Sequence, residues 1–274
     1  MQPTVSKPEP CPHCGGRGWI VSLDGGAGRA RPCSCRDVRD ANVVGRLLEE
    51  ADIPPRYRHC RLSNFQVHAG SPAVEGQLTQ ARSIAQQYAD GFVLEGGRFR
   101  ESGLLFFGPP GAGKTHLAVG VLQELVERHR VRARFAEFTS LIHQIQSTFD
   151  PGSEESKHEI LDPLVGAELL VLDELGSQQP TPWVRDILYL IINHRYTRRL
   201  PTVFTTNYLL DSPGRPARPR AVKSLDRGRD AEAAVPEEKL LASRLPAMLV
   251  SRLYEMAQPV ALNAVEDFRR EHKV

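Results

Sequence analysis

The sequence has no long hydrophobic run, no strong excess of either charge and no internal repeat. None of its apolar segments approaches the roughly 18 residues that cross a membrane. Its polar beginning, MQPTVSKPEP, lacks the apolar stretch of a secretory signal, so we expect a cytoplasmic protein. The 35 basic and 33 acidic residues leave a net charge of +2, so any contact with nucleic acid must come from a local patch.

Cysteine is scarce, but four of the five cysteines lie close together near the beginning of the chain. They are Cys11, Cys14, Cys33 and Cys35, arranged as a C-x-x-C pair and a later C-x-C pair. In a reducing compartment this clustering predicts a metal site rather than disulfides, and four thiolates form a closed tetrahedral Zn²⁺ site. So short a segment cannot bury a core, and zinc would supply its folding free energy. Four unliganded thiols are the alternative, and we expect His13 and Cys60 to lie outside the site.

The rest of the chain alternates short apolar runs with amphipathic stretches. Strands are predicted over residues 103–107, 134–138, 169–172, 202–205 and 260–262. Helices are predicted over residues 37–51, 114–128, 140–148, 183–197 and 240–256. This alternation indicates an α/β fold with a doubly wound parallel sheet.

Breaks in this pattern suggest the domain boundaries. We expect, in order, a disordered lead-in over residues 1–10, a zinc-binding segment with four cysteines over residues 11–36, a helical linker over residues 37–56 and a main domain over residues 57–274. Pro54 and Pro55 break the linker helix. Residues 212–236 begin with a stretch rich in Pro, Gly and Arg, and we expect a disordered basic insertion there.

A glycine-rich segment directly follows the first predicted strand of the main domain and opens a helix. Its residues are Gly108, Pro109, Pro110, Gly111, Ala112, Gly113, Lys114 and Thr115, which fit G-x-x-x-x-G-K-[ST]. The glycines let backbone N–H groups surround a polyphosphate, Lys114 should reach the β- and γ-phosphates of ATP, and the Thr115 hydroxyl should hold Mg²⁺. The alternative, a plain glycine-rich turn, does not explain the flanking strand and helix.

Polar residues also end two later strands. Asp173 and Glu174 follow the strand ELLVL, at the sheet edge where open α/β folds bind ligands. Asp173 is expected to bind Mg²⁺, mostly through water, and Glu174 to accept a proton from the water that attacks the γ-phosphate. Asn207 ends the strand PTVFTT and could orient that water, although an Asn after a strand is usually a turn former.

These motifs, with the segments IPPRYRHCRLSNF, NHRY, SRLYEM and EDFRR, resemble the DnaC and IstB branch of the AAA+ ATPases over about residues 50–274. The resemblance implies an AAA+ P-loop NTPase fold, with His116 beside the phosphate loop as a marker of the branch. It also implies that Arg252 is an arginine finger acting on the nucleotide of a neighbouring subunit, and that Arg269 is a sensor of nucleotide in its own subunit. Many relatives carry another Arg where Met248 stands here.

The resemblance further implies single-stranded DNA as a ligand. The segment SLIHQIQSTFDPGSEESKHEI is similar to the one that meets the strand in DnaC-type loaders. Its Phe149 could stack a base, although a Phe after an amphipathic helix is more often part of the core. The cluster RYTRR, from Arg195 to Arg199, could contact phosphates, and a solvated charge run is the alternative.

The leading interpretation is an ATP-hydrolysing helicase loader. Its zinc segment would dock on a replicative ring helicase, and its ATPase domain would form a homo-oligomer around single-stranded DNA. An IstB-type transposition helper that binds target DNA is the alternative, but such helpers generally begin with a short helical domain without cysteines. A nucleotide-gated adaptor that barely hydrolyses ATP is a third interpretation, against which Glu174 argues.

Overall fold

Helices and strands alternate through most of the chain in the computed structural model, which describes residues 11–14, 19–24, 27–67, 71–148, 156–178, 181–210 and 237–262. The helices are α1 (Cys35–Glu50), α2 (Pro72–Asp90), α3 (Lys114–His129), α4 (Phe138–Ser147), α5 (Lys157–Gly166), α6 (Pro182–Thr197) and α7 (Ala247–Met256). The strands are β1 (Trp19–Asp24), β2 (Ala27–Pro32), β3 (Gly103–Phe107), β4 (Ala133–Glu137), β5 (Leu169–Asp173), β6 (Thr202–Thr206) and β7 (Ala257–Ala261). Among the described residues, no helix combines the length and apolarity needed to cross a lipid bilayer.

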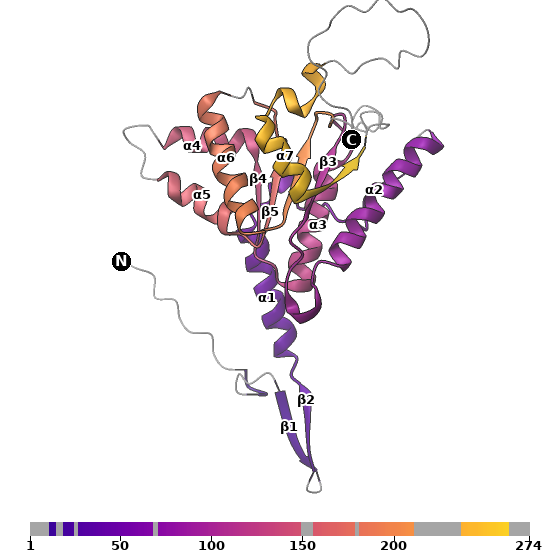
Figure 1. The fold of residues 1–274 in the computed structure, drawn as a ribbon. Helices are drawn as coiled ribbons and strands as arrows, with labels where there is room; N and C mark the ends of the chain where they lie inside the picture. The colour runs from indigo at the N-terminus through magenta and orange to yellow at the C-terminus, as the bar shows by residue number, and fades with distance from the viewer. Residues whose placement is uncertain are drawn as a thin grey trace, which may run out of the picture.

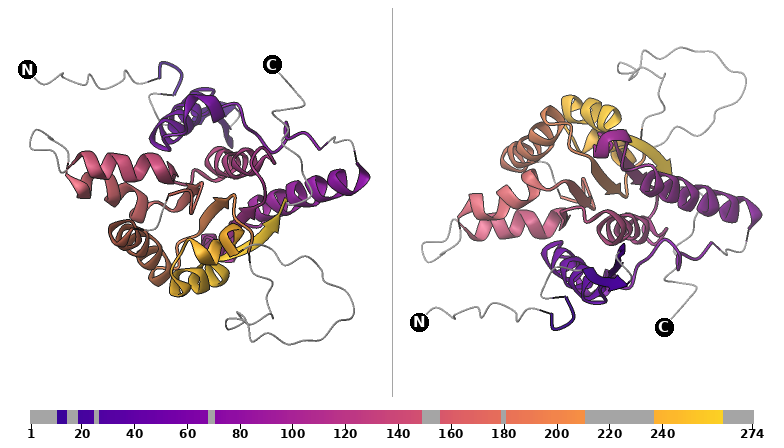
Figure 2. Two further views of the ribbon diagram at one scale, coloured as in Figure 1. Left: turned by 90° about the horizontal axis from the view of Figure 1, so that it is seen from above. Right: turned by 90° about the horizontal axis from the view of Figure 1, so that it is seen from below.

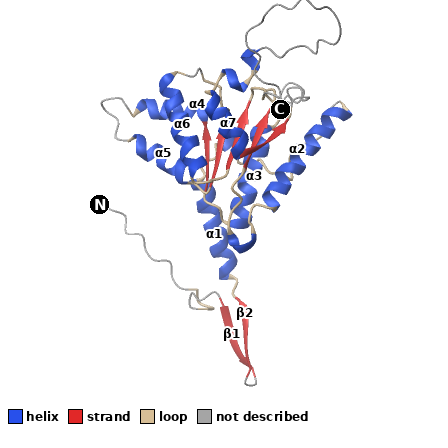
Figure 3. Ribbon diagram, in the orientation of Figure 1, coloured by secondary structure: helices blue, strands red, loops and turns tan. Residues whose placement is uncertain are grey.

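Five strands form the central sheet, in the order β4-β5-β6-β3-β7, and every neighbouring pair is parallel. Figure 3 shows these strands in the middle of the molecule with helices around them. Because the strands are parallel, their carboxyl ends meet at one edge, where open α/β sheets bind ligands. The loops after β3 and β5 therefore lie on either side of the end of β6. The predicted α/β fold with a parallel sheet is confirmed.

Alternate residues of each strand face two separate cores. Leu104 and Phe106 of β3 pack in the core that contains α2 and α3, whereas Leu105 between them packs in the core of α4 to α7. In β5, Val171 faces the first core and Leu172 the second. This two-residue period reflects the alternation of side chains along a strand. Figure 2 shows the resulting layers, with α1 and α3 on one side of the sheet and α6 and α7 on the other.

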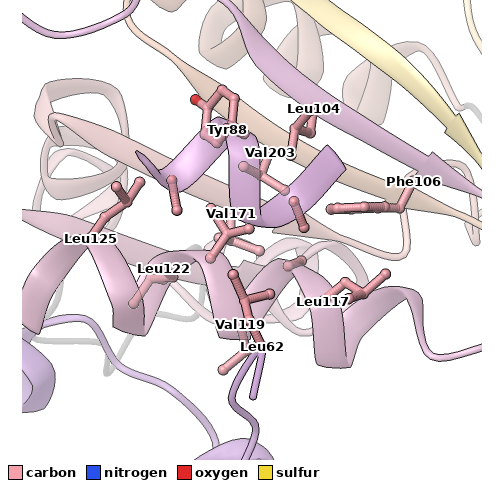
Figure 4. Packing of buried hydrophobic residues seen from close by; sticks show 14 of the residues in the cluster. Leu62, Tyr88, Leu104, Phe106, Leu117, Val119, Leu122, Leu125, Val171 and Val203 are labelled. Atoms are coloured by element: carbon pink, nitrogen blue, oxygen red, sulfur yellow. The ribbon is translucent and has the colours of Figure 1, made fainter. Parts of the chain in front are cut away.

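Helix α3, which begins at Lys114, is buried on nearly all sides. Leu117, Leu122 and Leu125 are fully buried, and Figure 4 shows these side chains beside Val171 and Val203 of the sheet. Helices α1 and α2 also contact α3, so the helix lies between them and the sheet. Burial of each such side chain is worth about 1.5–3 kcal/mol. The residues at the start of α3 are therefore held by a firmly packed element.

Strands β1 and β2 form an antiparallel hairpin apart from the central sheet. Their register runs from Trp19 opposite Pro32 to Asp24 opposite Ala27. Figure 1 shows the hairpin at the outer end of α1, away from the sheet. The other end of α1 reaches the main body, where the Phe135 N–H donates to the carbonyl of Ala51 at 2.8 Å. Helix α1 therefore joins the cysteine segment directly to the sheet.

The sequence patterns do not predict the hairpin or helices α2 and α5. Most of the buried side chains of α2 are small, as at Ala81, Ala85 and Ala89, so its apolar stripe is weak. Helix α5 carries a clearer signal, because the Ser156 side chain accepts from the Glu159 N–H and the Glu159 carboxylate accepts from the Ser156 N–H. Such a capping box marks a helix start and could have identified α5 from the sequence.

The last predicted helix is too long at its beginning. A helix over residues 240–256 is predicted, whereas α7 begins at Ala247. Pro246 is its N-cap residue, and the preceding residues form short 3₁₀ turns, one of them at Leu241–Ser243. Proline removes a backbone donor and clashes with the preceding turn of a helix, so the helix starts only after it.

Candidate active site

The loop between β3 and α3 depends on two positions that only glycine can occupy. Gly113 is the N-cap of α3 with φ +89°, and a Cβ there would lie 2.6 Å from the ring of Phe65. Gly108 has φ +147°, and a Cβ there would lie 2.6 Å from the carbonyl oxygen of Leu262. The first N–H groups of α3 therefore lie directly after the loop, which is the arrangement that binds phosphate groups.

Lys114 points into the curve of this loop. Its Nζ donates to the carbonyl oxygens of Gly108 at 2.9 Å and Pro109 at 2.7 Å. The side chain is only 6% exposed, although lysine is rarely buried. An ammonium group held among loop carbonyls is placed to meet phosphate oxygens that enter the same loop.

Three elements meet at Asp173, at the end of β5. Thr115 of α3 donates its hydroxyl to Asp173 Oδ1 at 2.9 Å, and Thr205 of β6 donates to the same oxygen at 2.6 Å. The backbone N–H of Glu174 donates to Thr205 Oγ1 at 3.0 Å. The phosphate loop and the acidic pair therefore form one hydrogen-bonded unit, although they are far apart in the sequence.

The carboxyl group of Asp173 is 1% exposed. Burial raises its pKa to about 6, while the Thr205 and Thr115 hydroxyls oppose the rise and the charges of Glu174 and Glu137 add to it. A buried carboxylate is stabilised by a cation bound beside it. The Asp173 carboxylate and the Thr115 hydroxyl are hard oxygen donors side by side, so the two residues fit Mg²⁺.

A cavity of about 350 Å³ lies in front of this unit. Lys114, Thr115, Glu174 and Asn207 all line it, so the structure brings the predicted phosphate loop together with the residues that end two later strands. The turn after α1 also lines the cavity, including Arg56, which no sequence motif identifies. One wall of the candidate site thus belongs to the segment that connects it to the cysteine hairpin.

A second cavity, of about 340 Å³, lies beside the glycine loop and shares Gly111 and Gly113 with the first. Its apolar walls include Phe65, Leu78 and Ala112. It is therefore an apolar recess next to the phosphate loop.

His116 lies at the border of the two cavities and lines both. Its Nε2 lies 3.0 Å from the carbonyl of Arg61 and 2.9 Å from Oδ1 of Asn64. Both atoms are acceptors, so Nε2 carries the proton, and burial lowers the pKa of the ring. His116 therefore ties the chain segment before α2 to the first turn of α3.

Arg252 of α7 is not among the residues that line the phosphate cavity. Its guanidinium carbon lies 5.1 Å from the ring centroid of Tyr189 and 5.4 Å from that of Tyr196, two residues of α6. Its Nη1 is buried without a hydrogen-bond partner among the described residues. Arg252 is thus half-buried against two tyrosine rings rather than free on the helix surface.

The prediction that Arg195 helps to contact DNA phosphates is wrong. Arg195 is fully buried, and burial lowers its pKa to about 9. Its guanidinium donates to Thr202 Oγ1 and to the carbonyl oxygens of Leu164, Ala167 and Pro201. The side chain ties the end of α5 to the start of β6. Of the same cluster, Arg198 and Arg199 are exposed, and Arg199 pairs with Glu101 at 3.2 Å.

The four clustered cysteines converge before α1 and at its first residue. Their Sγ atoms all lie within 4.8 Å of one another, with Cys11 and Cys33 separated by 3.8 Å and Cys14 and Cys35 by 3.3 Å. Tetrahedral zinc with Zn–S bonds of about 2.3 Å needs sulfur separations of about 3.8 Å. The donor set therefore fits a zinc ion.

Cys60 lies apart from this cluster. Its side chain is buried in the main core, and burial raises the pKa of its thiol to about 11. His13 is exposed, and it is not part of the group of possible metal ligands among the described residues. These positions agree with the expectation that neither residue binds the metal.

Several predicted features lie outside the described residues. They are Phe149, Arg269, the lead-in over residues 1–10 and the insertion over residues 212–236. Their proposed roles stay predictions.

Sequence reasoning missed Thr205 and Phe65 in this site. Thr205 belongs to the strand whose last residues, TTN, drew attention only to Asn207. A buried hydroxyl at the carboxyl end of a strand beside an acidic strand end is the signal that could have identified it. Phe65 lies in the segment IPPRYRHCRLSNF, for which the family resemblance assigned no individual roles.

Comparison with known proteins matches residues 63–214 to the family of IstB-like ATP binding proteins. The replicative helicase loader DnaC of Escherichia coli (strain K12) is 28% identical over 180 residues, which are 66% of this chain and 68% of DnaC. A crystal structure of the DnaC helicase loader is similar with a TM-score of 0.56 and 29% identity, covering 76% of this chain and 99% of that one. A crystal structure of DnaI has a TM-score of 0.54 at 20% identity, covering 79% and 94% of the two chains, and supports the fold alone.

Proposed function

The chain belongs to the family of IstB-like ATP binding proteins, and from this premise we propose that it is a helicase-loader ATPase acting in DNA replication. The observation that carries the ATPase part of the proposal is the convergence of Lys114, Thr115, Glu174 and Asn207 on one cavity, with Asp173 hydrogen-bonded to Thr115. In this set Lys114 is a cation that can bind phosphates, Thr115 and Asp173 are ligands for Mg²⁺, and Glu174 is a base that can accept a proton from water. The group of four cysteines before α1 and at its first residue favours the loader over the transposition helper.

ATP would bind with its phosphates in the glycine loop. The backbone N–H groups between Gly108 and Thr115 and the Lys114 ammonium would hold the phosphates. The apolar recess beside the loop would take the base, with Phe65, Leu78 and Ala112 as its contacts.

Thr115 and Asp173 would hold Mg²⁺. When bound, the ion supplies positive charge beside the phosphoryl oxygens. The oxygens of both residues already lie within hydrogen-bond distance of each other.

Glu174 would act as the general base. Glu174 lines the phosphate cavity, where its carboxylate would accept the proton of the attacking water. Asn207, in the same wall, would hold that water in place by a hydrogen bond from its amide.

Arg252 would complete the site of a neighbouring copy in a homo-oligomer. It does not line the phosphate cavity of its own chain, and its guanidinium rests on Tyr189 and Tyr196 at the surface between α6 and α7. Release from these rings would let it reach phosphate oxygens held by another subunit. Arg269 would contact nucleotide within its own subunit.

The cysteine cluster would bind one structural Zn²⁺ and shape the surface that docks on a replicative helicase. Its hairpin stands at the outer end of α1, where a partner can approach without covering the ATP site (Figure 1). Single-stranded DNA would be the second ligand, with Phe149 stacking on a base.

A transposition helper that binds duplex target DNA is the second candidate, because the matching family is named for IstB. The experiment that separates the two combines co-purification with measurement of ATPase activity. A loader is retained by the replicative helicase of its own cell and is stimulated by single-stranded DNA. Stimulation by duplex DNA alone, without retention by the helicase, would contradict the loader and support the transposition helper.

A further inference from the structure

The hydroxyl of Thr205 joins the two acidic residues of the site. Its Oγ1 donates to Asp173 Oδ1 at 2.6 Å and accepts from the Glu174 backbone N–H at 3.0 Å. A carboxylate can only accept and an amide can only donate, so the direction of both bonds is determined. The side chain is 1% exposed and is therefore shielded from bulk solvent. Both the proton and a lone pair of this hydroxyl are committed to the acidic pair.

The same strand end supports an unusual backbone conformation. Glu174 has φ +58°, in the left-handed region that residues with side chains seldom occupy. Its N–H is held by Thr205 Oγ1, and the next N–H, of Leu175, donates to the Thr205 carbonyl at 2.8 Å. Thr205 therefore supports the turn that places Glu174 in the wall of the phosphate cavity.

The carboxylate of Asp173 receives two hydroxyl donors at one oxygen. Thr115 of α3 and Thr205 of β6 both donate to Oδ1. When the Thr115 hydroxyl serves as a ligand of Mg²⁺, Thr205 is the donor that still fixes the rotation of the carboxylate. Preorganisation of this kind is what a supporting hydrogen bond gives to a metal ligand.

We propose that Thr205 is a positioning residue of the ATP site, which acts through its hydroxyl to orient the Asp173 carboxylate and the Glu174 backbone. This inference rests on the proposed function of the site. It differs from a packing role, because valine has nearly the same shape as threonine and lacks only the hydroxyl.

Two substitutions of Thr205 and one of a matched threonine test the proposal. Thr205→Val removes the hydroxyl and Thr205→Ser retains it. Thr202→Val is the control, because Thr202 is also buried on β6 but its hydroxyl binds Arg195, away from the site. Each variant is checked for folding by circular dichroism before it is assayed.

Two readouts are measured, the kcat and KM of ATP hydrolysis and the Mg²⁺ concentration that half-saturates binding of a fluorescent ATP analogue. For Thr205→Val we expect kcat to fall roughly ten- to a hundredfold with little change in KM, as for loss of a hydrogen bond to a charged group. The half-saturating Mg²⁺ concentration should rise severalfold. Thr205→Ser should restore both values, and Thr202→Val should change neither.

Wild-type values for Thr205→Val in both readouts would overturn the proposal, as would equal losses in Thr205→Val and Thr202→Val. Failure of serine to restore either readout would also overturn it. A wild-type protein that binds the analogue with Mg²⁺ but does not hydrolyse ATP would contradict the proposed ATPase function. In that case the Mg²⁺ titration alone decides the role of Thr205.

Discussion

Thr115 and Asp173 are joined by a hydrogen bond of 2.9 Å across 58 positions of the sequence. The bond connects the first turn of α3 to the end of β5, a strand of the central sheet on which α3 packs. It places a carboxylate in contact with the hydroxyl of Thr115, which lines the phosphate cavity together with Lys114. The charge of Asp173 is almost fully buried, and its burial lowers the free energy of unfolding of the protein.

Replacement of Asp173 by asparagine should stabilise the nucleotide-free protein. Burial raises the pKa of Asp173 from 3.8 to about 6, so the ionised group opposes folding at pH 7. The cost is roughly 3 kcal/mol on the scale of 1.36 kcal/mol per pKa unit. Asp173→Asn should therefore raise the midpoint of urea unfolding without ligand, and should abolish the stabilisation that Mg²⁺ and ATP give to the wild type.

The pH dependence provides the control for this prediction. A raised carboxyl pKa costs the most stability above pH 6 and progressively less as the group protonates below it. The difference between Asp173→Asn and the wild type should therefore shrink by about half between pH 7 and pH 5. A variant that is less stable than the wild type at pH 7 would contradict the account of Asp173.

Replacement of Arg195 by methionine should destabilise the protein strongly. The substitution removes the donor to the buried carbonyl oxygens of Leu164 and Ala167, which should cost about 3 kcal/mol or more. Arg198→Met is the matched control, because Arg198 is exposed three residues later, and its effect should stay within about 0.5 kcal/mol. Urea unfolding measures both, and equal effects would contradict the structural role of Arg195.

Much of the fold follows from the sequence because its strands are continuous apolar runs. The run at Gly103–Phe107 is buried on both faces, as expected for an inner strand of a covered sheet. Helix α2 is not predicted from the sequence, because the buried side chains of Ala81, Ala85 and Ala89 contrast only weakly in hydropathy with its polar face. The start of α7 is predicted too early because the helical pattern of apolar residues continues through Pro246. The helix begins only after this proline, which is its N-cap residue.

The candidate site is predictable where a short motif contains all the necessary chemistry. Lys114 and Thr115 belong to one such motif, and the pair Asp173 and Glu174 belongs to another. Arg195 was misassigned because its partners are backbone carbonyls of distant segments, which no local pattern reveals. In the sequence, such a buried guanidinium is indistinguishable from part of a charged surface.

The cysteine segment should contain one zinc ion per chain, and its loss should unfold only that segment. Cys33→Ser removes a buried ligand and should abolish zinc in metal analysis, because three thiolates no longer close the tetrahedron. Cys60→Ala is the control, since Cys60 lies in the main core and should leave zinc binding intact. ATP binding should survive in Cys33→Ser. Absence of zinc from wild-type protein purified without chelator would contradict the metal site.

Sharing of the ATP site between subunits can be tested by mixing two inactive variants. Arg252→Ala lacks the arginine and Lys114→Ala lacks the phosphate contact, so each alone should have little activity. Their mixture should recover ATPase activity, because some interfaces then pair an intact Arg252 with an intact phosphate loop. Recovery should rise with protein concentration and with added single-stranded DNA.

The two other outcomes of mixing have clear meanings. No recovery at any ratio would show that Arg252 acts within its own chain. Near wild-type activity of Arg252→Ala alone would show that the arginine is only a surface residue packed on Tyr189 and Tyr196.

The central claim is that the cavity between the glycine loop and the acidic pair binds and hydrolyses ATP. The most direct test measures the two steps separately, with titration of a fluorescent ATP analogue and single-turnover hydrolysis of ATP. Glu174→Gln should bind the analogue as the wild type does but hydrolyse ATP at least about a hundredfold more slowly, because the general base is lost. Lys114→Ala should bind it much more weakly. Hydrolysis by Glu174→Gln at the wild-type rate would contradict the assignment of the site.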